Sequence, residues 1–168
     1  ALTFYYNSQF INSPPTSLID LIEWIKNNKG RFTYSKPPDF LGTSFLKYLL
    51  IVGNKHQSED VFSGLYRAPT AQSKKQLLTP LWNILDEIHP YLWRQGRYFV
   101  DNGLGLRRLV GDGELSLSFT FSASDVPAAV DRYDLPTTIK SYAMDDGSLS
   151  NVHFVAIPFN ASHQAAAK

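Results

Sequence analysis

Apolar and polar positions repeat with two different periods along this chain, and the two periods predict helices and strands in alternation. Apolar residues recur at helical spacing in four segments, 18–25, 45–50, 77–93 and 104–110. Short apolar or alternating runs predict strands at residues 2–6, 31–34, 98–100 and 115–121. Alternation of this kind predicts an α/β fold with three layers, in which helices cover both faces of a mostly parallel sheet.

The end of the chain adds a different pattern. Two strand-like segments, 138–144 and 152–157, flank a turn of two aspartates and a glycine, so we expect them to pair antiparallel as additions to the sheet. Pro80 and Pro90 fall inside the helical period at 77–93. Because proline removes a backbone donor and crowds the preceding turn, they predict a helix split into two or three pieces.

The composition is that of one ordinary globular domain. Of the 168 residues, 43% are apolar and 18% are charged, and 16 Lys and Arg against 15 Asp and Glu leave a net charge of +1. A dedicated nucleic-acid binder is usually strongly basic, so we expect no nucleic-acid partner. No apolar run reaches the ~20 residues of a membrane helix, so we expect a chain that does not itself span a membrane.

The sequence carries no recognised catalytic or metal-binding pattern. No two of the four histidines stand at metal-ligand spacing, and the absence of cysteine excludes a thiolate metal site. Glycine-rich phosphate loops, dinucleotide fingerprints and nucleophile elbows do not occur after any predicted strand. We therefore expect a protein that is not an enzyme, with no catalytic residue, no metal and no cofactor.

Two loops that open predicted helices are the candidates for a ligand site. Residues 40–44 and 122–125 each bring hydroxyl groups and backbone N–H groups to the positive end of a helix, which favours a polar or anionic ligand group. Because such loops emerge at one edge of an open α/β sheet, we expect them to share a surface depression. The predicted ligand-binding residues are Phe40, Gly42, Thr43, Ser44, Ser122, Ser124 and Asp125. Residues of these types at a helix start are also common as simple N-caps, and that alternative stays open.

Several motifs, taken in order, resemble the second lobe of family 1 extracellular solute-binding proteins, which serve ABC importers. They are residues 2–7 (LTFYYN), 14–17 (PPTS), 31–34 (RFTY), 113–114 (GE, before the alternating strand) and 152–158 (VHFVAIP). Four segments resemble more narrowly the YnjB-type branch of that family, namely 24–28 (WIKNN), 30–34 (GRFTY), 37–40 (PPDF) and 89–96 (HPYLWRQG). The resemblance covers the chain from Leu2 to about Ser162.

The resemblance implies a periplasmic-binding-protein-like type II fold. Residues 1–162 would form the second lobe of a two-lobed protein whose first lobe is missing here, and residues 163–168 a frayed tail. Residues 2–6 and 152–157 would lie side by side as the two hinge crossings. The implied function is a periplasmic substrate-binding component that captures a small-molecule solute and delivers it to an ABC permease in the inner membrane. Effector-binding domains of bacterial transcription regulators share this type of fold and provide the alternative function.

Overall fold

A central strand, β1 (Thr3–Asn7), organises the sheet in the computed structural model, which describes residues 1–152, 156–157, 159–160 and 162. β2 (Leu117–Thr120) pairs with one edge of β1 and β3 (Ile139–Tyr142) with the other, both antiparallel. Phe4 in β1 faces Phe119 in β2 and Tyr142 in β3. The order β2-β1-β3 therefore places the first strand of the chain at the centre of the sheet.

The mixed α/β class is confirmed, but the prediction of a mostly parallel sheet is wrong for the described residues. β2 and β3 both run opposite to β1, so they are parallel to each other, and α6 (Asp125–Asp131) connects them. Because β1 lies between these two strands, both ladders of the described sheet are antiparallel. The alternation of strands and helices along the sequence predicted that α6 connects two parallel strands, but it did not predict that β1 lies between them.

Two further predicted strands, at 31–34 and 98–100, form only isolated backbone contacts with their neighbours. Residues 31–36 lie beside the start of β2, since the Ser116 N–H donates to the Arg31 carbonyl at 3.0 Å. On their other side, Ser35 forms one parallel bridge with Val100, next to a 3.0 Å hydrogen bond from the Lys36 N–H to the Val100 carbonyl. The strands predicted at 31–34 and 98–100 are thus reduced to an extended segment and one bridge.

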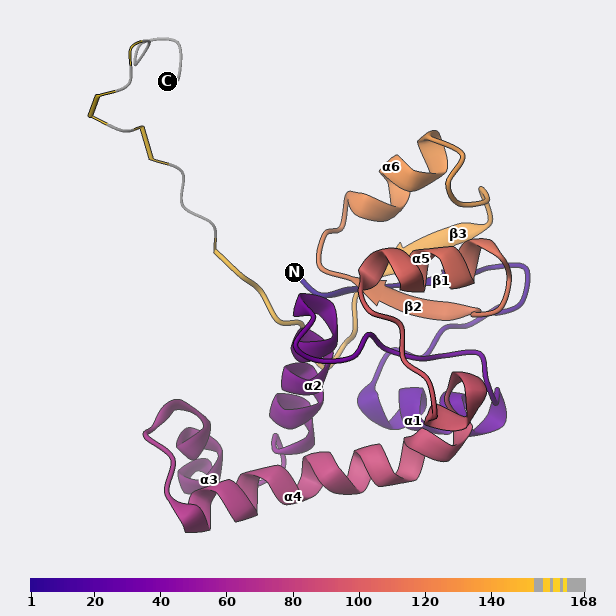
Figure 1. Ribbon diagram of the computed structural model, residues 1–168. Helices are drawn as coiled ribbons and strands as arrows, with labels where there is room; N and C mark the ends of the chain where they lie inside the picture. The colour runs from indigo at the N-terminus through magenta and orange to yellow at the C-terminus, as the bar shows by residue number, and fades with distance from the viewer. Residues whose placement is uncertain (153–155, 158, 161, 163–168) are drawn as a thin grey trace.

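The helices agree more closely with the predicted periods. They are α1 (Leu18–Asn27), α2 (Phe40–Gly53), α3 (Glu59–Ser63), α4 (Ala71–Ile88), α5 (Gly103–Gly111) and α6. Short 3₁₀ turns follow at Gly64–Tyr66, His89–Tyr91 and Trp93–Gly96. In Figure 1, α1, α2 and α4 lie below the sheet and α6 lies above it, while α3 stands at the far end of α4 from α1.

The predicted break of the long helix at Pro80 is wrong, because α4 continues through it. A Cβ placed on Gly53 of α2 would lie 3.0 Å from the Ile84 side chain and 3.7 Å from the Pro80 side chain, so the two helices are in close contact at this point. Packing against α2 therefore outweighs the hydrogen bond that proline removes. Pro90 lies in a 3₁₀ turn beyond the end of α4, as its position near an element start predicts.

Aromatic side chains join the sheet to the helices. The Phe119 ring lies 4.9 Å from the Phe45 ring of α2 and 5.8 Å from the Phe4 ring. All four residues of β2 are buried, so this strand is covered on both faces although apolar and polar residues alternate along it. The Phe119 side chain of β2 therefore contacts both α2 and the central strand β1.

The predictions for the last part of the chain fall largely on residues that the structure does not describe. Residues 153–155, 158, 161 and 163–168 are outside the described residues, so the strand predicted at 152–157, its pairing with residues 2–6 and the tail at 163–168 lie outside what the structure describes. Just before them, the Leu2 N–H donates to the Leu149 carbonyl at 2.8 Å. The chain therefore passes beside its own first residues at this point.

Candidate functional site

The first predicted ligand loop contacts the residue just before the second loop through a pair of aromatic rings. Phe40, the first residue of α2, lies edge-on against Phe121, which directly follows β2, with ring centroids 4.8 Å apart. Phe40 is 54% exposed, so this contact lies at the surface. The start of α2 and the end of β2 are thus neighbours.

The backbone N–H groups at the start of α2 already have an acceptor. Asp39 is the N-cap, and its Oδ2 accepts hydrogen bonds from the N–H groups of Leu41 (3.0 Å) and Gly42 (3.2 Å). The same oxygen accepts a 2.6 Å hydrogen bond from the Ser35 hydroxyl. The positive end of this helix therefore holds a carboxylate of the chain itself. Asp39 is not among the predicted site residues, although an aspartate just before a helical period is a common cap signal.

Three predicted residues of this loop face the protein interior to different degrees. Gly42 lies directly against the Ser35 carbonyl, because a Cβ placed on it would come within 1.8 Å of that oxygen. Ser44 is 5% exposed and belongs to the buried face of α2, whereas Thr43 is partly exposed. At Gly42 the chain is therefore in close contact with a neighbouring backbone segment.

The second loop presents its hydroxyl groups at the surface. The Ser122 and Ser124 side chains are exposed, and their Oγ atoms share a hydrogen bond of 2.9 Å. Ser124 precedes α6 but makes no side-chain capping bond to it. These two hydroxyls therefore hydrogen-bond to each other at the solvent-exposed surface.

Asp125 forms the centre of a polar cluster at the end of β2. Its Oδ2 accepts hydrogen bonds from Arg107 Nη2 of α5 at 2.5 Å and from Thr120 Oγ1 of β2 at 2.8 Å. The side chains of Arg107 and Asp125 are 23% and 36% exposed, so the ion pair is partly withdrawn from solvent. One carboxylate thus joins three elements, and the charges of the pair cancel.

A hollow of about 220 Å³, here called the β2-end hollow, opens above this cluster. Its lining residues are Tyr5, Leu41, Gly103, Leu104, Arg107, Phe119, Thr120, Asp125 and Val126. Burial raises the pKa of Tyr5 to about 12, so its phenol is protonated and neutral at pH 7. The hollow therefore offers hydroxyl groups and a neutralised ion pair between apolar walls, a surface suited to a small polar solute.

Glycine shapes one wall of the hollow. A Cβ placed on Gly103, the first residue of α5, would come within 2.4 Å of the Leu41 side chain of α2. This glycine lets the starts of the two helices come into direct contact. The β2-end hollow is consequently bounded by the first turns of α2, α5 and α6.

The structure separates the seven predicted residues. Asp125 lines the β2-end hollow, and Phe40 packs on Phe121, the neighbour of the lining residue Thr120. The other predicted residues do not line it; they are Gly42, Thr43, Ser44, Ser122 and Ser124. The assignment of all seven as ligand contacts stays a prediction.

Three polar residues of the hollow were not found by sequence reasoning. Thr120 could have been, since it stands on the hydroxyl side of the alternating run at 115–121 and follows the same pattern as the serines before it. Tyr5 and Arg107 carry no local signal, because a tyrosine in a strand and an arginine in an amphipathic helix have ordinary structural roles.

Among the described residues, no three or more histidine, cysteine, aspartate or glutamate side chains gather where they could hold a metal ion. No helix in the same part of the chain combines the length and the apolar character needed to cross a bilayer.

Comparison with known proteins gives one relation that covers the whole chain. No protein-family model matches it. Over 167 residues it is 38% identical to Protein YnjB of Escherichia coli (strain K12), an alignment that includes 99% of this chain and 42% of YnjB. The chain is a partial homologue of YnjB. It spans about two-fifths of the length of the relative that it matches.

Proposed function

We propose that this chain is a solute-binding lobe of the substrate-binding component of an ABC importer. In this proposal it works in the periplasm, captures a small solute without chemically changing it, and presents it to a permease in the inner membrane. The homology to YnjB over the whole chain supports the YnjB-type resemblance of its motifs. The type II lobe and its boundaries at residues 1–162 are part of the same proposal.

The observation that carries the proposal is the β2-end hollow. Three helix starts and one strand end converge on it, and it combines Thr120, Asp125 and Arg107 with apolar walls. Ligand sites in layered α/β proteins lie where strand ends and helix starts converge in this way. Its polar groups are already mutually oriented, which lowers the entropic cost of arranging them around a ligand.

The size of the hollow fits a site shared between two lobes. Complete small-molecule pockets hold roughly 300–1,000 Å³. The β2-end hollow holds about 220 Å³, less than such a complete pocket. In the proposal a second lobe supplies the opposite wall, and the aromatic pair of Phe40 and Phe121 stands at the edge that this lobe would approach.

The test compares this chain with the longer two-lobed protein that the proposal requires, each purified without denaturation and analysed by native mass spectrometry for retained small molecules. We expect the longer protein to retain a solute and this chain to retain little of it. Losing ~4 kcal/mol of contacts moves a micromolar site to roughly millimolar affinity.

The same experiment includes variants that isolate the β2-end hollow. Arg107→Gln combined with Asp125→Asn, made in the longer protein, should abolish retention while far-UV circular dichroism stays unchanged. The control is Arg132→Gln combined with Asp134→Asn, which removes an exposed ion pair of the same composition, 3.2 Å long, outside the hollow. Equal retention in both double variants would reject the hollow as the site. Micromolar binding by this chain alone would favour the alternative, a self-contained effector-binding domain.

A further inference from the structure

A second, larger hollow lies on other elements and shares no lining residue with the β2-end hollow. It holds about 570 Å³ between the end of α1 and the 3₁₀ turns that follow α4. Its lining includes Lys29, Tyr91, Arg94, Gln95 and Arg97 but no acidic residue. We call it the basic hollow.

The three cationic groups of the basic hollow are not neutralised by the described part of the chain. No ion pair joins Lys29, Arg94 or Arg97 to a carboxylate among the described residues. Glu114 lies next to this segment, where its Oε2 accepts a 2.6 Å hydrogen bond from Trp93 Nε1, and it forms no ion pair with these three residues. Three cationic groups that form no ion pair, gathered in one concave surface, attract multiply charged anions.

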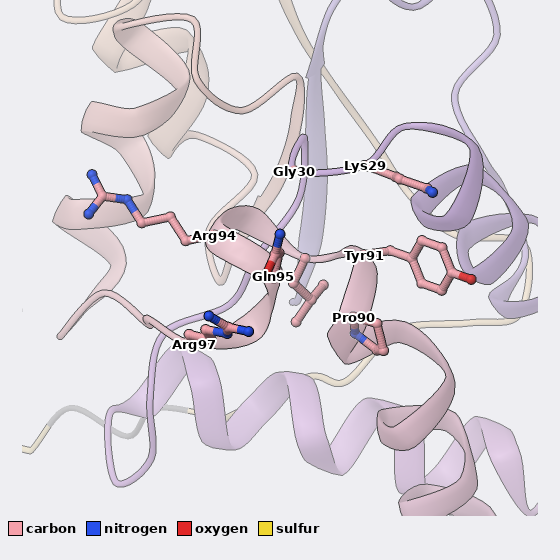
Figure 2. A pocket seen from close by; sticks show the side chains of 8 residues that line it. Lys29, Gly30, Pro90, Tyr91, Arg94, Gln95 and Arg97 are labelled. Atoms are coloured by element: carbon pink, nitrogen blue, oxygen red, sulfur yellow. The ribbon is translucent and has the colours of Figure 1, made fainter.

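The side chains are spread along the hollow. In Figure 2, Lys29 and Tyr91 stand at one side, Arg94 extends toward the other, and Gln95 and Arg97 lie between them. A single small anion could meet only part of this set. An extended ligand that carries negative charge at more than one position could reach the cations in the middle and at the ends.

The backbone that carries these residues is held in an unfavourable conformation. Arg94, Gln95 and Gly96 have φ values of 49°, 59° and 66°, three consecutive residues in the left-handed region. Two of the three are not glycine, so the turn is strained. Strain of this kind persists where surrounding contacts enforce it, and it concentrates at functional sites.

Identifiable contacts enforce this turn. The Gln95 N–H donates to the Leu92 carbonyl at 2.8 Å, and a Cβ placed on Gly96 would come within 2.6 Å of the His89 carbonyl oxygen. The Arg94 guanidinium is stacked 4.5 Å from the Trp93 ring centroid and 5.7 Å from that of Tyr98. The turn and its first arginine are therefore positioned before any ligand arrives.

We propose that the basic hollow binds an extended oxyanion that carries two or more phosphate or carboxylate groups. Guanidinium groups suit this chemistry, because their N–H groups match the spacing of two oxygens in either group. The proposal does not depend on the function of the β2-end hollow, and the failure of either leaves the other unaffected.

The test titrates the 168-residue chain with pyrophosphate and, separately, with citrate by isothermal titration calorimetry at low ionic strength. We expect binding that weakens with added salt, with the stronger of the two probes identifying the preferred oxyanion. Arg97→Gln should weaken binding about tenfold, because it removes a charge-assisted contact. Arg67→Gln is the matched control, since it removes one exposed arginine outside the hollow, and its affinity should equal that of the unchanged chain.

Arg94→Gln adds a second measurement at the other end of the hollow, with a thermal melt to show that the loss of its aromatic stacking leaves the chain folded. Equal affinities for Arg97→Gln and Arg67→Gln would overturn the proposal. The absence of any titration with either probe at ~10 mM, a concentration that would reveal even millimolar affinity, would do so too. Binding of an acidic peptide but of neither small anion would replace the proposal with a protein-docking surface.

Discussion

At Gly42 a single missing side chain decides how α2 meets the rest of the molecule. The ideal Cβ position lies 1.8 Å from the Ser35 carbonyl oxygen and 2.7 Å from its carbon, so the obstacle is backbone and cannot rotate away. This contact brings the start of α2 against the segment that bridges to Val100. The requirement for glycine at this position is one of space.

We predict that Gly42→Ala destabilises the chain by at least about 3 kcal/mol, because the added methyl forces α2 and the Ser35 segment apart. The free energy of unfolding measured by urea denaturation checks this value. Gly64→Ala is the control, since its Cβ would lie 3.4 Å from the Leu77 side chain in ordinary contact, and the helical φ of −60° suits alanine. A loss of stability in Gly42→Ala no greater than in Gly64→Ala would contradict the packing role.

At the scale of one element, α2 depends on a cap that links it to the neighbouring segment. Asp39 Oδ2 satisfies two N–H groups of the first turn and the hydroxyl of Ser35, which is fully buried. Without this carboxylate, the Ser35 hydroxyl and both amides lose their acceptor. The cap thus fixes the start of the helix, and with it the position of Phe40 beside Phe121 and of Leu41 in the wall of the β2-end hollow.

We predict that Asp39→Ala lowers the free energy of unfolding by about 2 kcal/mol, from the lost cap and the unpaired buried hydroxyl. Asp39→Asn should recover part of this loss, because its amide oxygen can still accept. Ser58→Ala is the control at a helix whose N-cap side chain makes no capping bond, and its stability should stay near that of the unchanged chain. Denaturation curves that place all three variants together would contradict the assigned role of Asp39.

Across the whole molecule, stability is distributed unevenly. The hydrophobic core draws residues from every strand and from most helices, yet no residue between positions 53 and 77 belongs to it. α3 has no buried residue, and Figure 1 shows it with the first turns of α4 extending away from the sheet. The chain therefore has a cooperative body and a helical extension whose opening exposes little apolar surface.

We predict that backbone amides of residues 59–76 exchange with solvent through local opening, at a free energy at least about 2 kcal/mol below that of global unfolding. Amides of β1 and of the buried face of α2 should require global unfolding. Hydrogen exchange followed by mass spectrometry measures both groups in one sample. Equal protection in the extension and in β1 would show that the extension is part of the cooperative body.

Local sequence determined the elements whose stability depends on nearest neighbours. The apolar stripe from Leu18 to Ile25 predicted α1, and the Ser17 hydroxyl caps it by accepting from the Asp20 N–H. The alternating run at 115–121 predicted β2. These patterns suffice because amphipathic periods and caps act within one or two turns of the chain.

Tertiary structure alone decided the sheet and the site. Whether two strands pair parallel or antiparallel depends on which strands become neighbours in the sheet. The sequences of β1, β2 and β3 do not reveal that β1 lies between the other two. Pro80 likewise remains helical because α2 packs beside it. At the β2-end hollow, Asp125 was within reach of sequence reasoning, but its partner Arg107 was not. A side chain becomes part of a site through residues brought beside it from other elements, and sequence periodicity carries no information about those long-range contacts.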